Sequence, residues 1–355
     1  MTRPAFPLRA GSLGKIAQTL AIGTVGGGVL TLLGVPASWL CGSMVAVSFA
    51  SLTGVSGPIP RWLRAIAFLL LGVSMGASVT PDIVENVSKW PVSITALILI
   101  QPVVIGLVWL YLHRIVGWTS STALFSAIPG ALSYVVAVAD QSDADMQKVT
   151  VAQSIRVFIL VISLPAIVTL IGSGGEAASG LPLKAASGLD QAAIQLAAGS
   201  VGAALFYWLR VPAGVLLGAF AGSAVLHGTG IAEGRLPAYF LVPGLVIMGS
   251  VIGGRFVGAT FSNVAAVLKP ATIAFAIAMA VNTVLAIGIA ELLNAPFAKT
   301  LLAFAPGGLD AMTVLAFALA LDPAFVAAHH TSRFLMMIVV LPILARRMLK
   351  KGPDA

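Results

Sequence analysis

Two arginines, Arg156 and Arg333, lie within apolar stretches of the chain. Each follows an aspartate, Asp145 or Asp322, at the same spacing. A charged side chain inside a membrane is costly and marks either a functional site or a paired structural charge. The arginines therefore predict one of two arrangements. Either both guanidinium groups face a central cavity that holds an anion, or each neutralises a local acid or caps main-chain carbonyls.

A Pro-Gly pair precedes each arginine and interrupts an apolar segment, and the two pairs lie 306 − 129 = 177 residues apart. The pairs are Pro129-Gly130 and Pro306-Gly307, and Gly308 follows the second. Proline removes a backbone donor and clashes with the preceding helical turn, so we expect both helices to break there. The half-helices that begin near Leu132 and Leu309 would then offer free N–H groups and partial positive charge to an anion. The alternative is a kink that serves packing only.

The position after each break differs between the two copies, since Asp310 follows the second break and Ser133 follows the first. A carboxylate there could bind Na⁺ or carry a proton, and the alternative is a cap on the free N–H groups. The predicted substrate-binding residues are Pro129, Gly130, Ser133, Arg156, Pro306, Gly307, Gly308 and Arg333. The predicted ion-coupling residue is Asp310.

The other reactive side chains do not form a catalytic or metal-binding pattern. His329 and His330 are adjacent on a predicted helix, so they point about 100° apart and cannot share a metal ion. The sequence has no His-Glu-x-x-His, Cys-x-x-Cys or nucleophile-elbow pattern. We therefore expect no catalytic residue, no metal and no cofactor. We also expect Arg255 to be structural, and Asp143 and Asp145 to be solvated at a segment end.

The composition indicates that membrane helices position these residues. The chain of 355 residues is 59% hydrophobic and 9% charged, with a mean hydropathy of +1.03. A soluble domain carries about 25% charged residues, so this chain has too few charges to cover a water-facing surface. The net charge of +8 comes mostly from Lys and Arg at the ends of apolar segments, such as Arg61 and Arg64. That distribution is the positive-inside pattern and does not indicate nucleic-acid binding.

The sequence predicts an all-α integral membrane protein of two homologous halves, because Val35-Pro36-Ala37 returns as Val211-Pro212-Ala213 and Gly42 returns as Gly218. Duplicated halves with interrupted hydrophobic segments are typical of transporter-type binding sites. We expect a first membrane repeat over residues 15–172, a linker over 173–189 and a second repeat over 190–346. The expected hydrophobic segments are 15–34, 36–55, 62–80, 91–113, 119–141 and 147–172, and then 190–209, 211–229, 239–260, 270–293, 298–321 and 323–345.

Two topologies follow from these segments. If the broken segment crosses the membrane, each half has six spans and the halves are parallel. If it is a re-entrant hairpin, each half has five spans plus the hairpin and the halves are inverted. Both models place most Lys and Arg residues on the same side, so the positive-inside rule does not choose between them.

The duplicated unit, with Val-Pro-Ala at 35–37 and 211–213 and Pro-Gly-x-Leu at 129–132 and 306–309, resembles the AbrB duplication family of bacterial membrane proteins. Family members often have an acidic pair such as Glu-Met after the break, which here is matched by Asp310-Ala311-Met312 but not by Ser133-Tyr134-Val135.

The family is often labelled ammonia monooxygenase or transcriptional regulator. A copper oxygenase needs converging ligands, which four scattered histidines do not supply. Direct DNA regulation needs an exposed basic module, and no stretch outside the apolar segments is long enough for one.

These observations together predict a secondary transporter of a small anionic metabolite, coupled to H⁺ or Na⁺, with its site at the two broken helices. The first alternative is a membrane regulator or sensor that affects gene expression indirectly. The second, which the sequence favours less, is a membrane enzyme of the ammonia monooxygenase type. We expect a multi-pass protein of the bacterial inner membrane with both termini cytoplasmic. Its partners would be the lipid bilayer, the solute, the coupling ion and further copies in a homo-oligomer, with no direct nucleic-acid partner.

Overall fold

The computed structural model describes residues 10–78, 87–130, 135, 142–171 and 186–349. Within these ranges the regular structure is helical, apart from an isolated bridge between Ala186 and Arg235. Seven of the described helices are long and apolar enough to cross a membrane, by length and composition: Leu13–Leu32, Trp90–Ile115, Met146–Leu170, Leu189–Trp208, Ala238–Phe256, Phe261–Leu293 and Pro323–Leu341. The predicted all-α class is therefore confirmed.

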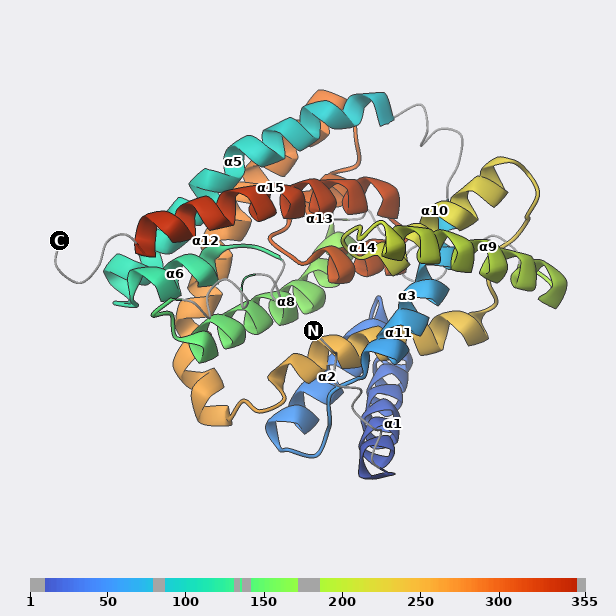
Figure 1. Ribbon diagram of the computed structural model, residues 1–355, viewed down its shortest axis with the longest axis horizontal. Coiled ribbons are helices and arrows are strands. Elements are labelled where there is room, and N and C mark those ends of the chain that lie inside the picture. The colour runs from blue at the N-terminus through green and yellow to red at the C-terminus, as the bar shows by residue number, and fades with distance from the viewer. Residues whose placement is uncertain (1–9, 79–86, 131–134, 136–141, 172–185, 350–355) are drawn as a thin grey trace.

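The helices follow one another along the chain as Figure 1 shows. The first half contains α1 (Ala10–Leu32), α2 (Ser38–Leu52), α3 (Arg61–Gly76), η1 (Val87–Lys89), α5 (Trp90–Leu110), η2 (Tyr111–Ile115), α6 (Ser120–Ala127) and α8 (Met146–Leu170). The second half contains α9 (Leu189–Trp208), α10 (Gly214–Gly228), α11 (Ala238–Gly253), η4 (Gly254–Phe256), α12 (Phe261–Leu293), α13 (Phe297–Phe304), α14 (Leu309–Ala318) and α15 (Pro323–Leu349).

The helices pack as two bundles, and each bundle takes helices from both halves of the chain. The first bundle contains α1, α2, α3, α9, α10 and α11, and the second contains α5, α6, α8, α12, α13, α14 and α15. In Figure 1 the first bundle occupies the lower and right part of the molecule and the second bundle the upper and left part. One hydrophobic core joins the two bundles, with members such as Leu40, Leu71, Leu160, Leu245 and Leu315.

Several local features recur at matched positions in the two halves. Ala37 and Ala213 both adopt the left-handed conformation with φ of 52°, immediately before α2 and α10. Asp145 Oδ1 accepts a hydrogen bond of 3.0 Å from the backbone N–H of Lys148 at the start of α8. Asp322 Oδ1 accepts two such bonds of 3.1 Å at the start of α15. These matches agree with the predicted duplication, which stays a prediction.

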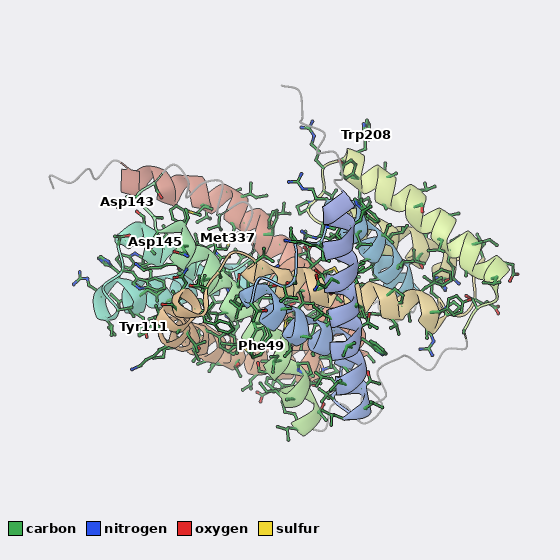
Figure 2. The ribbon with its side chains drawn as sticks, turned by 90° about the horizontal axis from the view of Figure 1, so that it is seen from below. Phe49, Tyr111, Asp143, Asp145, Trp208 and Met337 are labelled. Carbon is green, nitrogen blue, oxygen red and sulfur yellow. The ribbon has the colours of Figure 1, made fainter. Side chains whose placement is uncertain are left out.

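Asp143 and Asp145 lie together at one end of the second bundle, far from Trp208 in the first bundle (Figure 2). Asp143 is exposed, and the side chain of Asp145 is 41% exposed and lies 3.0 Å from Lys148 Nζ. The backbone N–H of Lys148 lowers the pKa of the Asp145 carboxyl. The stability that this cap contributes is therefore present above the ordinary carboxyl pKa and is lost as pH falls through the lowered value.

Glycines let α11 lie directly on α2 in the first bundle. A Cβ added to Gly249 would lie 2.5 Å from Leu40 O, and one added to Gly253 would lie 2.6 Å from Met44 O. Real Cβ atoms do not approach a carbonyl oxygen so closely, so only glycine permits this contact, as in other close membrane-helix packings. The contact residues increase together along the two helices, which means that α2 and α11 run in the same direction.

The same packing joins α3 to α10. A Cβ added to Gly72 would lie 2.5 Å from Leu216 O, and one added to Gly76 would lie 2.6 Å from Phe220 O. Here too the contact residues increase together, so α3 and α10 run in the same direction. The two helix pairs are related by exchanging each helix for its counterpart in the other half.

These directions favour one of the two topologies. The predicted segments 36–55 and 62–80 are consecutive spans, which cross a membrane in opposite directions, so the prediction has α3 running opposite to α2. In parallel halves α11 would run like its counterpart α3, and therefore opposite to α2. Because α11 runs with α2, the packing fits inverted halves, in which the broken segment of each half is a re-entrant hairpin.

The predicted span at 270–293 begins too late. α12 is a single helix of 33 residues from Phe261 to Leu293, with Pro270 inside it. Its start is fixed by Thr260, whose side chain accepts a hydrogen bond of 3.2 Å from Asn263 N. Lys269 and Pro270 lie inside this helix, and the capping threonine determines its first turn.

We predict that Gly76→Ala and Gly253→Ala each lower the free energy of unfolding by about 1–3 kcal/mol, because the added methyl group must displace main-chain atoms of the facing helix. Gly28→Ala on α1 is the matched control, since an added Cβ there meets no heavy atom within 4 Å. Thermal unfolding of the detergent-solubilised proteins measures the difference. Equal melting temperatures for all three variants would contradict the close helix approach.

Candidate functional site

Both Pro-Gly pairs interrupt their helices, as the sequence predicts. In the second half, residues 305–308 separate α13 from α14, and Gly308 is an extended N-cap. In the first half α6 ends before Ile128, which is also extended. Gly130 follows with φ of +79°, a left-handed conformation that glycine adopts without steric cost.

The two breaks lie against each other. A Cβ added to Gly130 would lie 3.5 Å from Gly307 O, in ordinary van der Waals contact. The half-helix after the second break begins at Leu309, as predicted. The corresponding start near Leu132, together with the predicted site residue Ser133, lies outside the described residues. Segments that are far apart in the sequence therefore meet at the centre of the candidate site.

Arg156 is buried on α8, and its guanidinium caps the end of α6. Nη1 donates to Ser126 O over 3.3 Å, and Nη2 donates to Ile128 O over 3.1 Å. Carbonyls at a helix end have no helical partner, so a charged donor satisfies them where water is scarce. Of the two arrangements predicted for this arginine, the structure shows the carbonyl cap.

Arg333 on α15 makes the equivalent contact with the end of α13. Nη1 donates to Ala305 O over 2.8 Å, and Nη2 reaches Ala303 O at 3.5 Å. Both carbonyls occupy the positions that Ser126 and Ile128 occupy in the first half. Only 2% of Arg333 is exposed, so this guanidinium is fixed among main-chain oxygens.

A second side chain contacts a further carbonyl at each helix end. Gln153 Nε2 donates to Phe125 O over 2.8 Å, and at the matched position His330 Nε2 lies 3.1 Å from Leu302 O. His330 Nδ1 lies 2.7 Å from Nη2 of Arg333. The tautomer with its proton on Nε2 satisfies both contacts, because Nε2 then donates to the carbonyl while Nδ1 accepts from the guanidinium.

A cavity of about 520 Å³ lies where the breaks face the first bundle. Six of the predicted site residues line it: Pro129, Gly130, Gly307, Gly308, Asp310 and Arg333. The first bundle contributes Pro58, Ile59, Arg64, Pro212, Ala213, Val251, Gly254 and Arg255. Arg156 lies instead on a separate cavity of about 20 Å³ and does not line this one.

The cavity is lined by more positively than negatively charged side chains. Arg64 of α3 and Asp310 of α14 form an ion pair, and the Arg64 guanidinium also lies 4.9 Å from the centre of the Phe68 ring. No side chain caps α14, so Asp310 pairs across the cavity and does not act as the predicted alternative cap. Arg255 of η4 lines the same cavity, and no described residue forms a hydrogen bond or ion pair with its guanidinium.

Sequence reasoning missed three residues of this cavity, Arg64, Arg255 and His330. Arg64 stands in the first turn of a helix, where a basic residue looks like a positive-inside anchor. Arg255 could have been recognised as a site residue from the sequence, because it is an arginine at the end of an apolar span. From the sequence His330 stands out only as a possible metal ligand, and the described residues contain no group of three His, Cys, Asp or Glu that could hold a metal ion.

Metal chemistry finds no support among the described residues, which contain no group of three His, Cys, Asp or Glu able to hold a metal ion. His329 and His330 have different partners, since His329 Nε2 lies 2.8 Å from Ser93 Oγ on α5. His329 therefore faces the interior of the second bundle, whereas His330 faces the cavity.

The fold and the site define a helical protein of the membrane-spanning type with two interrupted helices that meet at a charged cavity. The chain belongs to the AbrB family, because residues 8–349 match the family described as transition state regulatory protein AbrB. It is 25% identical to the uncharacterized protein YhjN of Bacillus subtilis (strain 168), over 91% of this chain and 90% of that protein. It is 27% identical to a proposed regulator, AbrB, of Escherichia coli (strain K12), over 88% of this chain and 90% of that protein.

We predict that Arg156→Gln lowers the free energy of unfolding by about 2–4 kcal/mol, because two buried carbonyls lose a charged donor. Arg156→Lys retains a donor but loses the forked geometry, so the loss is smaller. Arg114→Gln, at an exposed position, is the control and leaves stability unchanged. Denaturant or thermal unfolding in detergent measures the three effects, and a fully stable Arg156→Gln protein would show that the cap is dispensable.

Proposed function

We propose that this protein is a secondary transporter of a small organic anion and that the cavity between the two breaks is its binding site. The observation that carries the proposal is the lining of this cavity, which combines three arginines, one aspartate and two interrupted helices. We further propose that the protein acts in a bacterial inner membrane, without enzymatic activity, and that it assembles as a homo-oligomer.

The charge balance favours an anion. Among the described lining residues, Arg64, Arg255 and Arg333 oppose the single carboxylate of Asp310. Arg333 is held by main-chain carbonyls, while no described residue forms a hydrogen bond or ion pair with the Arg255 guanidinium, which makes it available to a solute. A guanidinium binds a carboxylate through two parallel hydrogen bonds. The uncapped start of α14 adds backbone N–H groups and partial positive charge on the same side.

The arrangement of the bundles favours transport over static binding. Irregular backbone is tolerated at membrane depth only where it is buried in protein or lines a wet cavity. Here it lines a cavity between two bundles, and the elements that surround the solute come from both of them. Movement of one bundle relative to the other would expose the cavity first to one side of the membrane and then to the other.

A second candidate function follows from the name of the Escherichia coli relative, which describes a proposed regulator. Such a protein would bind the same anion without moving it and would act through a partner. The helical elements described here include no separate domain that could carry an output. Flux through liposomes separates the two functions, because a sensor binds solute but gives no uptake.

We predict that proteoliposomes containing the purified protein take up a small carboxylate from a panel of mono- and dicarboxylates, and that Arg255→Gln lowers the apparent affinity about tenfold or more through loss of a charge-assisted contact. Because no described residue forms a hydrogen bond or ion pair with the Arg255 guanidinium, the variant should keep its melting temperature. Radiolabelled uptake measures the affinity, and Arg114→Gln is the control with unchanged transport. Binding without uptake would favour the sensor, and neither binding nor uptake for any anion would contradict the proposal.

A further inference from the structure

The carboxylate of Asp310 lines the cavity and binds an arginine there, as the carboxylate of a solute would. It belongs to α14 of the second bundle, and its carboxylate pairs with Arg64 of α3 in the first bundle. Arg64 is a flexible donor whose side chain is 41% exposed. A guanidinium already bound to a carboxylate of the protein is not available to a carboxylate of the solute.

We propose that Arg64 is a second ligand of the transported anion, that Asp310 masks it, and that a proton bound to Asp310 uncovers it. This inference rests on the proposed anion transport and names its coupling ion. When a proton adds to the Asp310 carboxylate, the side chain becomes a neutral acid and its attraction for Arg64 falls. The solute then binds Arg64 together with Arg255. One anion and one proton enter together, so the total charge of the cavity is unchanged.

The surroundings of Asp310 fit a proton better than Na⁺. A metal ion needs several oxygen ligands, and the other charged side chains that line the cavity beside this carboxylate are Arg64, Arg255 and Arg333. A guanidinium supplies hydrogen-bond donors only and no oxygen ligand. No group of three acidic, His or Cys side chains occurs among the described residues. A proton needs only one oxygen atom, which Asp310 supplies.

The remaining groups that face the cavity do not provide the same switch. The other charged groups are the guanidinium groups of Arg64 from α3, Arg255 from η4 and Arg333 from α15, and arginine side chains do not exchange their proton in proteins. His330 from α15 is the only other titratable side chain in the described lining, and both of its ring nitrogens are engaged, by Leu302 O and by Arg333. Asp310 is therefore the group whose protonation changes the partner of a cavity arginine.

The test measures binding of methanesulfonate, an anion that stays fully ionised from pH 5 to pH 8, to the purified full-length protein by calorimetry. We expect the affinity of the unchanged protein to rise as pH falls, by about tenfold per pH unit at most, because one proton is taken up per anion. Asp310→Asn should bind at least as tightly as the unchanged protein at pH 5 and should show no dependence on pH.

Two control variants accompany Asp310→Asn. Asp322→Asn neutralises another paired carboxylate, which lies 2.7 Å from Lys299 Nζ and outside the cavity, and it should keep the pH dependence. His330→Gln copies the residue at matched position 153 and should keep the pH dependence whatever its affinity. Asp310→Ser, with the residue of matched position 133, serves as the second variant if Asp310→Asn does not elute as a single species from a sizing column.

The outcomes separate this inference from the proposed function. Binding of methanesulfonate at equal affinity from pH 5 to pH 8, or unchanged pH dependence in both Asp310 variants, overturns the proton-linked masking but leaves anion binding intact. Binding that requires Na⁺ in place of choline at constant pH and chloride also overturns it. Absence of binding at every pH overturns both the inference and the anion site.

Discussion

A helix that ends inside an apolar bundle leaves carbonyl groups that no water can reach, and the architecture of this protein depends on satisfying them. Arg156 and Arg333 do so at the ends of α6 and α13. The buried charge of each arginine is costly alone, and so are the unpaired carbonyls. Together they are stable, and the two half-helices can stop where the cavity begins.

Much of this arrangement could be predicted from the sequence because its causes are local. Proline forces a break in its own helix, so the interruptions at Pro129 and Pro306 follow from a single residue type. The matched spacing of the two arginines indicated a paired role. The partner of each arginine could not be predicted, because every residue has a main-chain carbonyl and the residue types do not show which one accepts the hydrogen bond. The pairing of Arg64 with Asp310 was out of reach for another reason, since it joins helices that are far apart along the chain.

The topology, too, depends on contacts between helices that are far apart along the chain and that the sequence does not identify. The numbers of Lys and Arg residues in the loops fit both candidate topologies, so they do not distinguish between them. The direction of packing between α2 and α11 favours inverted halves, and it depends on glycines whose helical partners are known only from the structure. A glycine in an apolar segment predicts close packing, but it does not name the helix on which it packs. The cavity lies between two bundles that each contain helices from both halves of the chain.

The scaffold is nearly symmetric, but the charges on it are not. Arg255 and Asp310 stand where the first half has Ser78 and Ser133, and Arg64 stands where the second half has Leu241. In a carrier with inverted halves, exchanging the conformations of the two halves converts an outward-facing state into an inward-facing one. With identical halves these states would have equal free energy. If the protein is the carrier proposed above, the unequal charges remove that degeneracy, and the resting carrier would favour one side of the membrane and bind solute with different affinity at its two faces.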